Sequence, residues 1–242
     1  SDLRKQLPPG PDGKPRFAER KIVPLEVEYP EAERRVHRLL KEYAASRQAG
    51  AGSSAARVAT EFVTILLKKR LFSSPRAFLH TLDQHLRTLG GKHGALPADD
   101  ALVRSAFERL DEEISDEDEL EEATESALAT AARGAQAVTP EQRALLQEMQ
   151  AWAEAEAARP DAKAKVLLEW LERTCRPDGA WNDERVIIFT EYRDTQNWLV
   201  ELLTAAGLGG ERLDGERLRP VLDQYPDEHR DVPDRVHGAL ER

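Results

Sequence analysis

The sequence predicts a mostly helical α/β protein, in which a helical region is followed by a partial RecA-like parallel β-α-β unit. Apolar residues recur at helical spacing through most of residues 30–175. The run Val-Ile-Ile-Phe at residues 186–189 is apolar without alternation, which is typical of a strand buried on both faces. A helical pattern around residues 198–203 and a short strand-like piece at 211–214 complete the predicted unit.

The N-terminal part of the chain predicts one strand and three helices. Residues 22–29 partly alternate, and Pro24 restricts such a strand to the edge of a sheet. Pro30 and the acidic residues after it favour the start of a helix. A Gly, Ala and Ser-rich loop separates this helix from a second one over residues 55–72, and a third begins at Ser74-Pro75 and ends at Gly90-Gly91.

The middle of the chain predicts further helices and a strongly acidic stretch. Residues 99–133 have a helical pattern, yet nine of the twelve residues from 111 to 122 are acidic. Like charges at close helical spacing oppose helix formation, so we expect fraying there. The acidic stretch is either a solvated insert or a surface that docks a basic partner or imitates nucleic acid. Two more helices are predicted over residues 140–158 and 161–175.

Charge is distributed unevenly over the 242 residues, a length sufficient for one or two domains. Residues 1–92 carry 18 Lys and Arg against 10 Asp and Glu, whereas the remainder carries 17 against 35. The basic part suits contact with nucleic-acid phosphates, although a solvated surface of Arg-rich helices has the same composition.

The single cysteine excludes an internal disulfide and fits the cytoplasm, and no apolar run predicts a membrane span.

Several segments resemble a known family of motors. The residues at 186–190, with Asp194-Thr195 and the leucines that follow, resemble motif IV at the start of the second RecA-like lobe of superfamily-two helicases. Residues 212–215, 219 and 222–225 are similar to a segment of the Swi/Snf branch. The helix containing Asp161-Ala-Lys163 resembles the one that leads into that lobe. Residues 66–78 are similar to bacterial RapA-like members and to the helicase-like subunit of DISARM phage-defence systems.

The resemblance covers residues 57–90 and 159–225 and implies a division of the chain. Residues 1–29 would end lobe one with an edge strand, 30–92 would form a basic helical region, and 93–158 an acidic helical insert. Residues 159–242 would begin the C-terminal RecA-like lobe. The intact protein would then be an ATP-dependent translocase on double-stranded DNA, using ATP and magnesium, in phage defence with other subunits as partners.

The motif that would bind ATP is missing from the sequence. No G-x-x-x-x-G-K-[ST] loop occurs, because Gly90-Gly91-Lys92 is followed by His93. Asp111-Glu112 follows a helical pattern, where a magnesium-binding acidic pair would need a buried strand. We therefore expect no catalytic residue, no bound cofactor and no metal site on this chain alone, although the intact protein would hydrolyse ATP. The rival hypothesis is a non-enzymatic helical scaffold for protein interactions.

The basic cluster Lys68-Lys69-Arg70 is the first candidate for nucleic-acid binding. Three consecutive helical positions cover about 200° of the helix, so at least one of the charges must point away from the core. These side chains would contact phosphates, or else extend over the edge of the core with their charges in water.

Thr190, Arg193 and Thr195 are the other candidates for nucleic-acid binding. Thr190 would lie at the C-terminal tip of the predicted strand, and Thr195 near the first turn of the next helix, where backbone N–H groups bind anions. In the motors that the sequence resembles, this segment lies near the DNA phosphates. The alternative is that Thr190 and Asp194 cap the helix.

Overall fold

The computed structural model describes residues 21–90, 105, 117–133 and 137–209 of the chain. These residues form seven α-helices and no β-strand, so the predicted α/β class is wrong and the described fold is all-α. The helices, in chain order, are α1 (Glu31–Gly50), α2 (Ser54–Ser73), α3 (Pro75–Gly90), α5 (Glu117–Arg133), α6 (Pro140–Glu156), α7 (Ala162–Cys175) and α8 (Arg193–Ala205).

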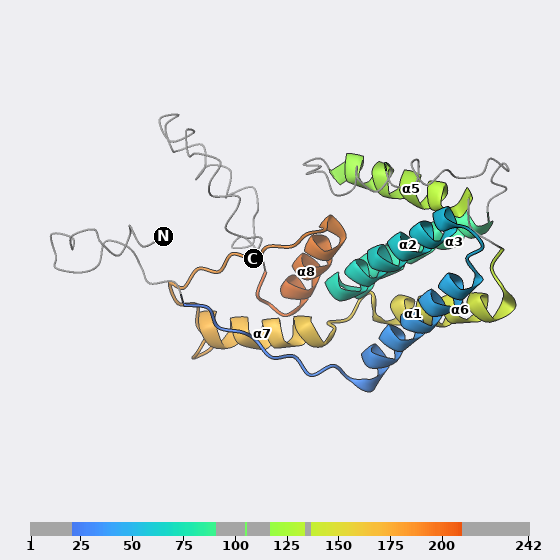
Figure 1. Ribbon diagram of the computed structural model, residues 1–242. Helices are drawn as coiled ribbons and strands as arrows, with labels where there is room; N and C mark the ends of the chain where they lie inside the picture. Colours follow the sequence, from blue (N-terminus) through green and yellow to red (C-terminus); the bar gives the residue numbers. More distant parts are fainter. Residues whose placement is uncertain (1–20, 91–104, 106–116, 134–136, 210–242) are drawn as a thin grey trace, which may run out of the picture.

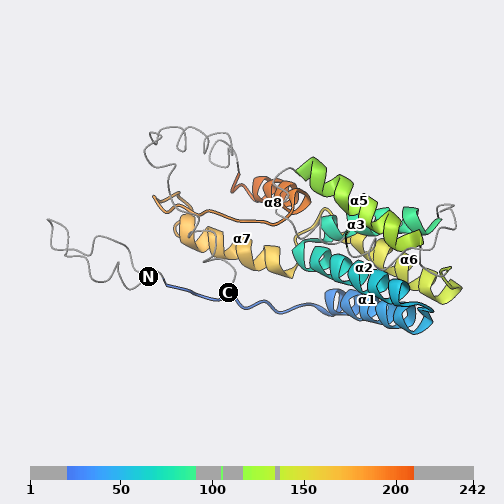
Figure 2. The same ribbon diagram turned by 45° about the horizontal axis from the view of Figure 1, so that its top comes forward.

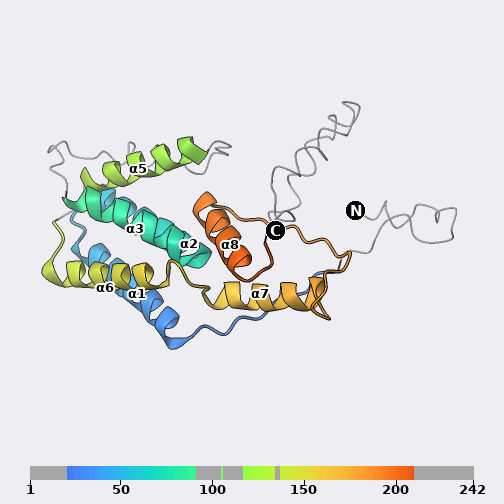
Figure 3. The same cartoon turned by 180° about the vertical axis from the view of Figure 1, so that it is seen from behind.

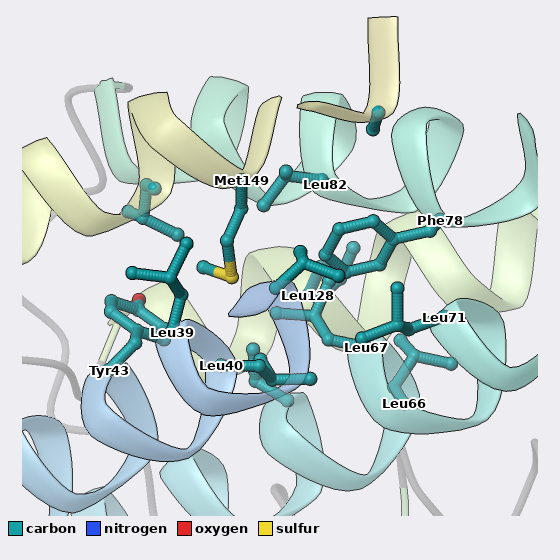
Figure 4. Close-up of a cluster of buried hydrophobic side chains, with 14 of the residues drawn as sticks. Leu39, Leu40, Tyr43, Leu66, Leu67, Leu71, Phe78, Leu82, Leu128 and Met149 are labelled. Carbon is teal, nitrogen blue, oxygen red and sulfur yellow. The ribbon is translucent and has the colours of Figure 1, made fainter. Parts of the chain in front are cut away.

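Five of the helices, α1, α2, α3, α5 and α6, pack as a bundle around one core (Figure 1). Leu67, Phe78 and Met149 are completely buried in it, and Figure 4 shows them among leucines from the neighbouring helices. Helices α7 and α8 lie together at one end of the bundle, as the views in Figures 2 and 3 also show. Their own apolar cluster includes Leu171, Cys175 and Leu203.

Helix starts follow the capping residues of the sequence. Ser53 accepts a hydrogen bond from the Ala56 backbone N–H at 3.1 Å. Thr139 and Gln142 form a reciprocal capping box at the start of α6, as the Thr-Pro-Glu-Gln pattern predicts. At α7 the buried Asp161 accepts from the Ala164 N–H at 2.7 Å. These local signals place the three helices where the apolar spacing predicts them.

The predicted strand at residues 186–189 is wrong. The segment is extended, but it has no strand partner among the described residues. Ile187 is 68% exposed and Phe189 is 87% exposed, opposite to a strand buried on both faces. Apolar β-rich composition indicates an extended backbone, whereas a strand also needs a neighbour for its hydrogen bonds. The edge strand predicted at residues 22–29 is likewise extended and unpaired where described, with Ile22 80% exposed.

Helix α8 confirms the helical pattern that follows the extended segment. Trp198, Leu202 and Leu203 are buried on its inner face. Gly207, with a φ of 71°, ends it in the left-handed conformation that glycine adopts without strain. The Leu208 N–H then bonds the Leu203 carbonyl at 2.8 Å.

Several predicted features lie outside the described residues. They are the strand at 211–214, the Swi/Snf-like residues at 212–215, 219 and 222–225, the Asp111-Glu112 pair and the residues from 91 to 93. Of the acidic stretch, the described part begins at Glu117 and is helical in α5. No helix among the described residues has the length and apolar character needed to cross a membrane.

Candidate nucleic-acid interface

The six candidate residues come from two places in the chain that the fold brings together, the end of α2 and the start of α8. The Thr195 hydroxyl lies 2.6 Å from the Ser73 hydroxyl and 2.9 Å from that of Ser74. The Arg70 guanidinium carbon stacks 3.7 Å from the centre of the Tyr192 ring. The turn between α2 and α3 is therefore joined directly to the start of α8.

Two of the candidates are buried at this junction. Arg70 is only 8% exposed and Thr195 only 6% exposed. Their side chains hold α2 against α8, and little of either surface is open to a phosphate. Lys68, Lys69 and Arg193 are exposed, and Thr190 is half-buried, so these four carry the accessible polar groups.

Three of the accessible candidates, Lys68, Lys69 and Thr190, border two adjoining hollows, which together we call the α2–α8 groove. One part of it, of about 460 Å³, is lined by residues of α2 together with Glu191, including Lys68 and Lys69. The other part, of about 280 Å³, lies between the extended segment, α7 and α8 and includes Thr190 among its walls. Ser73 and Glu191 line both parts, so the two hollows adjoin.

Lys163 occupies the α7 wall of the α2–α8 groove. Its ammonium group donates to the backbone carbonyls of Phe72 and of Ser73, the latter at 3.0 Å. These are carbonyls at the end of α2 that have no partner within the helix, so Lys163 caps that helix. Burial lowers the pKa of Lys163, although the negative charges of Asp161 and Glu33 act in the opposite direction.

The capping alternative for Thr190 and Asp194 does not hold. The N-cap residue of α8 is Tyr192, with no side-chain hydrogen bond to the helix. Asp194 instead accepts a hydrogen bond from His80 Nδ1 at 2.8 Å, which is the main reason that the pKa of its carboxyl lies below the usual value. The Thr190 hydroxyl makes no hydrogen bond to another described residue, so it faces the groove uncommitted.

Sequence reasoning missed the groups that hold α8 on α3. Arg76 donates two hydrogen bonds of 2.6 Å to the carboxylate of Glu201, and His80 binds Asp194 beside them. The partners lie more than a hundred residues apart in the chain, and no local pattern signals such a pair. The sequence places Lys163 in a motif but does not indicate that it caps α2.

The described residues include no cluster suited to the magnesium that the resemblance implies. No three His, Cys, Asp or Glu side chains among them are grouped closely enough to hold a metal ion. Asp161 and Glu191 lie in the groove, but Asp161 is committed to the Ala164 N–H. We assign no catalytic step to these residues.

No protein-family model matches the chain, and no curated protein or solved structure matches it significantly.

Proposed function

We propose that this chain is the DNA-contacting part of an ATP-dependent motor similar to the Swi/Snf translocases, and that the α2–α8 groove binds the backbone of duplex DNA. The observation that supports the proposal best is the position of Lys68 and Lys69. Both are exposed, and both border the same groove as Thr190, although they stand about 120 residues away in the sequence.

The chemistry of these groups suits phosphate binding. Each lysine that neutralises a phosphate releases condensed counterions, which favours binding without regard to base sequence. The exposed Arg193 at the start of α8 adds a third positive charge, and the Thr190 hydroxyl can donate a hydrogen bond to a phosphate oxygen. Glu191 lines both parts of the groove and opposes an anion there, so the phosphates are expected along the exposed Lys68 and Lys69 of α2.

ATP and magnesium enter this proposal through the resemblance alone. The same is true of phage defence and of further defence-system subunits as partners. The motor would use ATP bound elsewhere, and the groove described above would supply contacts to the DNA on which it moves.

A helical scaffold for protein interactions is the second candidate function. It is favoured by the exposure of the apolar side chains of Ile187 and Phe189, which suits a protein partner better than a phosphate backbone. A scaffold would bind no duplex DNA at moderate salt, so one binding measurement separates the two candidates.

The test is the affinity of the full chain for a fluorescein-labelled duplex, measured by anisotropy. Lys68→Ala with Lys69→Ala is expected to weaken binding about tenfold or more at low salt. Arg57→Ala with Arg143→Ala is the matched control, because it removes two exposed positive charges from other parts of the bundle and should change the affinity much less. The proposal fails if wild-type protein does not bind the duplex, or if both double variants weaken binding equally.

A further inference from the structure

Two phenylalanine rings are exposed in the walls of the α2–α8 groove. Phe189 lines the part between the extended segment, α7 and α8, and is 87% exposed. Phe72 lines the part along α2 and is 45% exposed. The exposed side chains of Ile188 and Ile65 lie in the same two parts. The groove therefore offers aromatic and apolar surface, which a phosphate backbone alone would leave uncovered.

Phe72 belongs to a row of three rings. The His37 ring lies 4.6 Å from it, measured between ring centres, with the two planes tilted by 36°. Tyr29 meets His37 edge-on at 6.1 Å. These contacts join Phe72 to α1 and to the segment before it, while much of the Phe72 ring stays open to solvent. A ring that is already held by its neighbours loses little freedom when a further flat ring packs on it.

Positive charge surrounds this row of rings. The Lys68 ammonium lies 6.0 Å from the centre of the Phe72 ring. Burial is the main reason that the pKa of His37 lies below its usual value. Three nearby lysines lower the pKa of His37 further, namely Lys163, Lys41 and Lys68. Lys41 and Lys68 are exposed, so an anion beside these rings meets lysine charges.

We propose that the α2–α8 groove binds single-stranded nucleic acid, with bases stacked on Phe189 and Phe72 and phosphates beside Lys68 and Lys69. The inference rests on the proposed function, because it keeps nucleic acid in the groove and adds contacts to the bases. Aromatic side chains beside a positively charged track bind single strands with little regard to sequence. In a duplex the bases are paired and stacked on one another, so only an unpaired strand can cover the rings.

The lysines favour a nucleic-acid strand over an apolar peptide. Lys68 and Lys69 line the same part of the groove as Phe72, so a ligand that covers this ring lies against two positive charges. A single strand suits both features, since it carries a phosphate with every base. Glu191 lines both parts of the groove and would oppose a phosphate, but it can accept a hydrogen bond from the amino group of a base.

A strand without bases separates stacking from charge. Two fluorescein-labelled strands of about 15 nucleotides have the same number of phosphates, and in one of them the inner positions are abasic. Anisotropy titration of the full chain at low salt measures both affinities, beside that for the blunt duplex. The wild type should bind the strand with bases about tenfold or more tightly than the abasic strand, because bases can stack on the two rings.

The variant Phe72→Leu with Phe189→Leu removes both rings and keeps apolar side chains in their place. Its preference for the strand with bases over the abasic strand should fall to about twofold or less. Trp181→Leu is the matched control, because it removes a partly exposed ring that does not line the groove, and it should keep the wild-type preference. Circular dichroism of each variant verifies that the helices are retained.

The three ligands distinguish failure of this inference from failure of the proposed function. A wild type that binds the duplex but has equal affinity for the two strands would overturn the inference alone, as would a phenylalanine double variant with an unchanged preference. Binding of the strand with bases but not of the duplex would support base stacking and overturn the duplex contacts. Binding of none of the three ligands would overturn both and leave the exposed rings to a protein partner.

Discussion

Thr190 and Thr195 differ in what surrounds their hydroxyl groups, and this difference can be measured. The Thr195 hydroxyl is buried between those of Ser73 and Ser74, whereas that of Thr190 lines the groove and has no partner among the described residues. Thr195→Val should lower the free energy of unfolding by about 1–3 kcal/mol, because it leaves buried hydroxyls without a partner. Thr190→Val should change it by less than about 0.5 kcal/mol. Urea denaturation measures the unfolding free energy of both variants. Equal losses in the two variants would contradict the difference between these hydroxyl groups.

His85 makes the stability of the bundle depend on pH. The ring is buried beside Tyr43, with Nε2 at 2.7 Å from the hydroxyl, and burial lowers the pKa of His85 to about 3. Because this folded-state pKa lies below the unfolded value of about 6.5, the unfolded chain binds the proton more readily in that window. Stability is complete above about pH 6.5 and falls by up to about 1.4 kcal/mol per pH unit as the pH is lowered towards 3.

The replacement His85→Gln isolates this effect, since glutamine does not titrate. Denaturation is measured at pH 7, 6 and 5. As the pH falls from 7 to 5, the variant should lose less unfolding free energy than the wild type. His37, whose pKa is also lowered by burial, remains in both proteins and cancels in the comparison. If the unfolding free energies of wild type and His85→Gln change equally with pH, His85 does not cause the pH dependence.

At the level of single residues, the sequence allows only part of the site to be predicted. The helical pattern of α2 indicates that a cluster of three positive charges cannot all face the core, and Lys68 and Lys69 are indeed exposed. Arg70 is buried because Tyr192 stacks on it, and Thr195 is buried because Ser73 contacts it. In both pairs the two residues lie far apart in the sequence. Such contacts carry no local signal.

At the level of elements, the cap that α7 gives to α2 should be a measurable part of the fold. Lys163 donates to two carbonyls at the end of α2, while Lys165 on the same helix is exposed. Lys163→Met keeps the aliphatic stem but loses the cap, and should cost about 1–2 kcal/mol of unfolding free energy. Lys165→Met should change it by less than about 0.5 kcal/mol. Thermal unfolding of the two variants measures these changes. If Lys163→Met leaves the unfolding free energy unchanged, Lys163 does not stabilise α2 as a cap.

Helices were predictable here and strands were not, for a physical reason. A helix satisfies its backbone internally, so capping residues such as Thr139 and Asp161 and a periodic apolar face locate it from local sequence. A strand is satisfied only by a neighbour, and the composition of residues 186–189 carries no information about whether one is present. The segment is extended as its composition indicates, but exposed and unpaired.

At the level of the whole molecule, five helices form a bundle around one core, and α7 and α8 lie at one end of it (Figure 1). The α2–α8 groove exists because this position sets the exposed end of α2 beside the extended segment. The uneven charge of the sequence indicates a basic surface. It does not indicate that Lys68 and Lys69 would border the same groove as Thr190. That arrangement follows from the contacts of α8 with α2 and α3.

The most direct test of the account is the salt dependence of duplex DNA binding by the full chain. If Lys68 and Lys69 each neutralise a phosphate, replacing both with alanine should reduce the slope of log affinity against log salt by about 1.8, or about 0.9 for each contact. Arg57→Ala with Arg143→Ala should leave the slope at the wild-type value. An unchanged slope in the Lys68→Ala, Lys69→Ala variant would contradict the account and exclude these lysines from the DNA-binding surface.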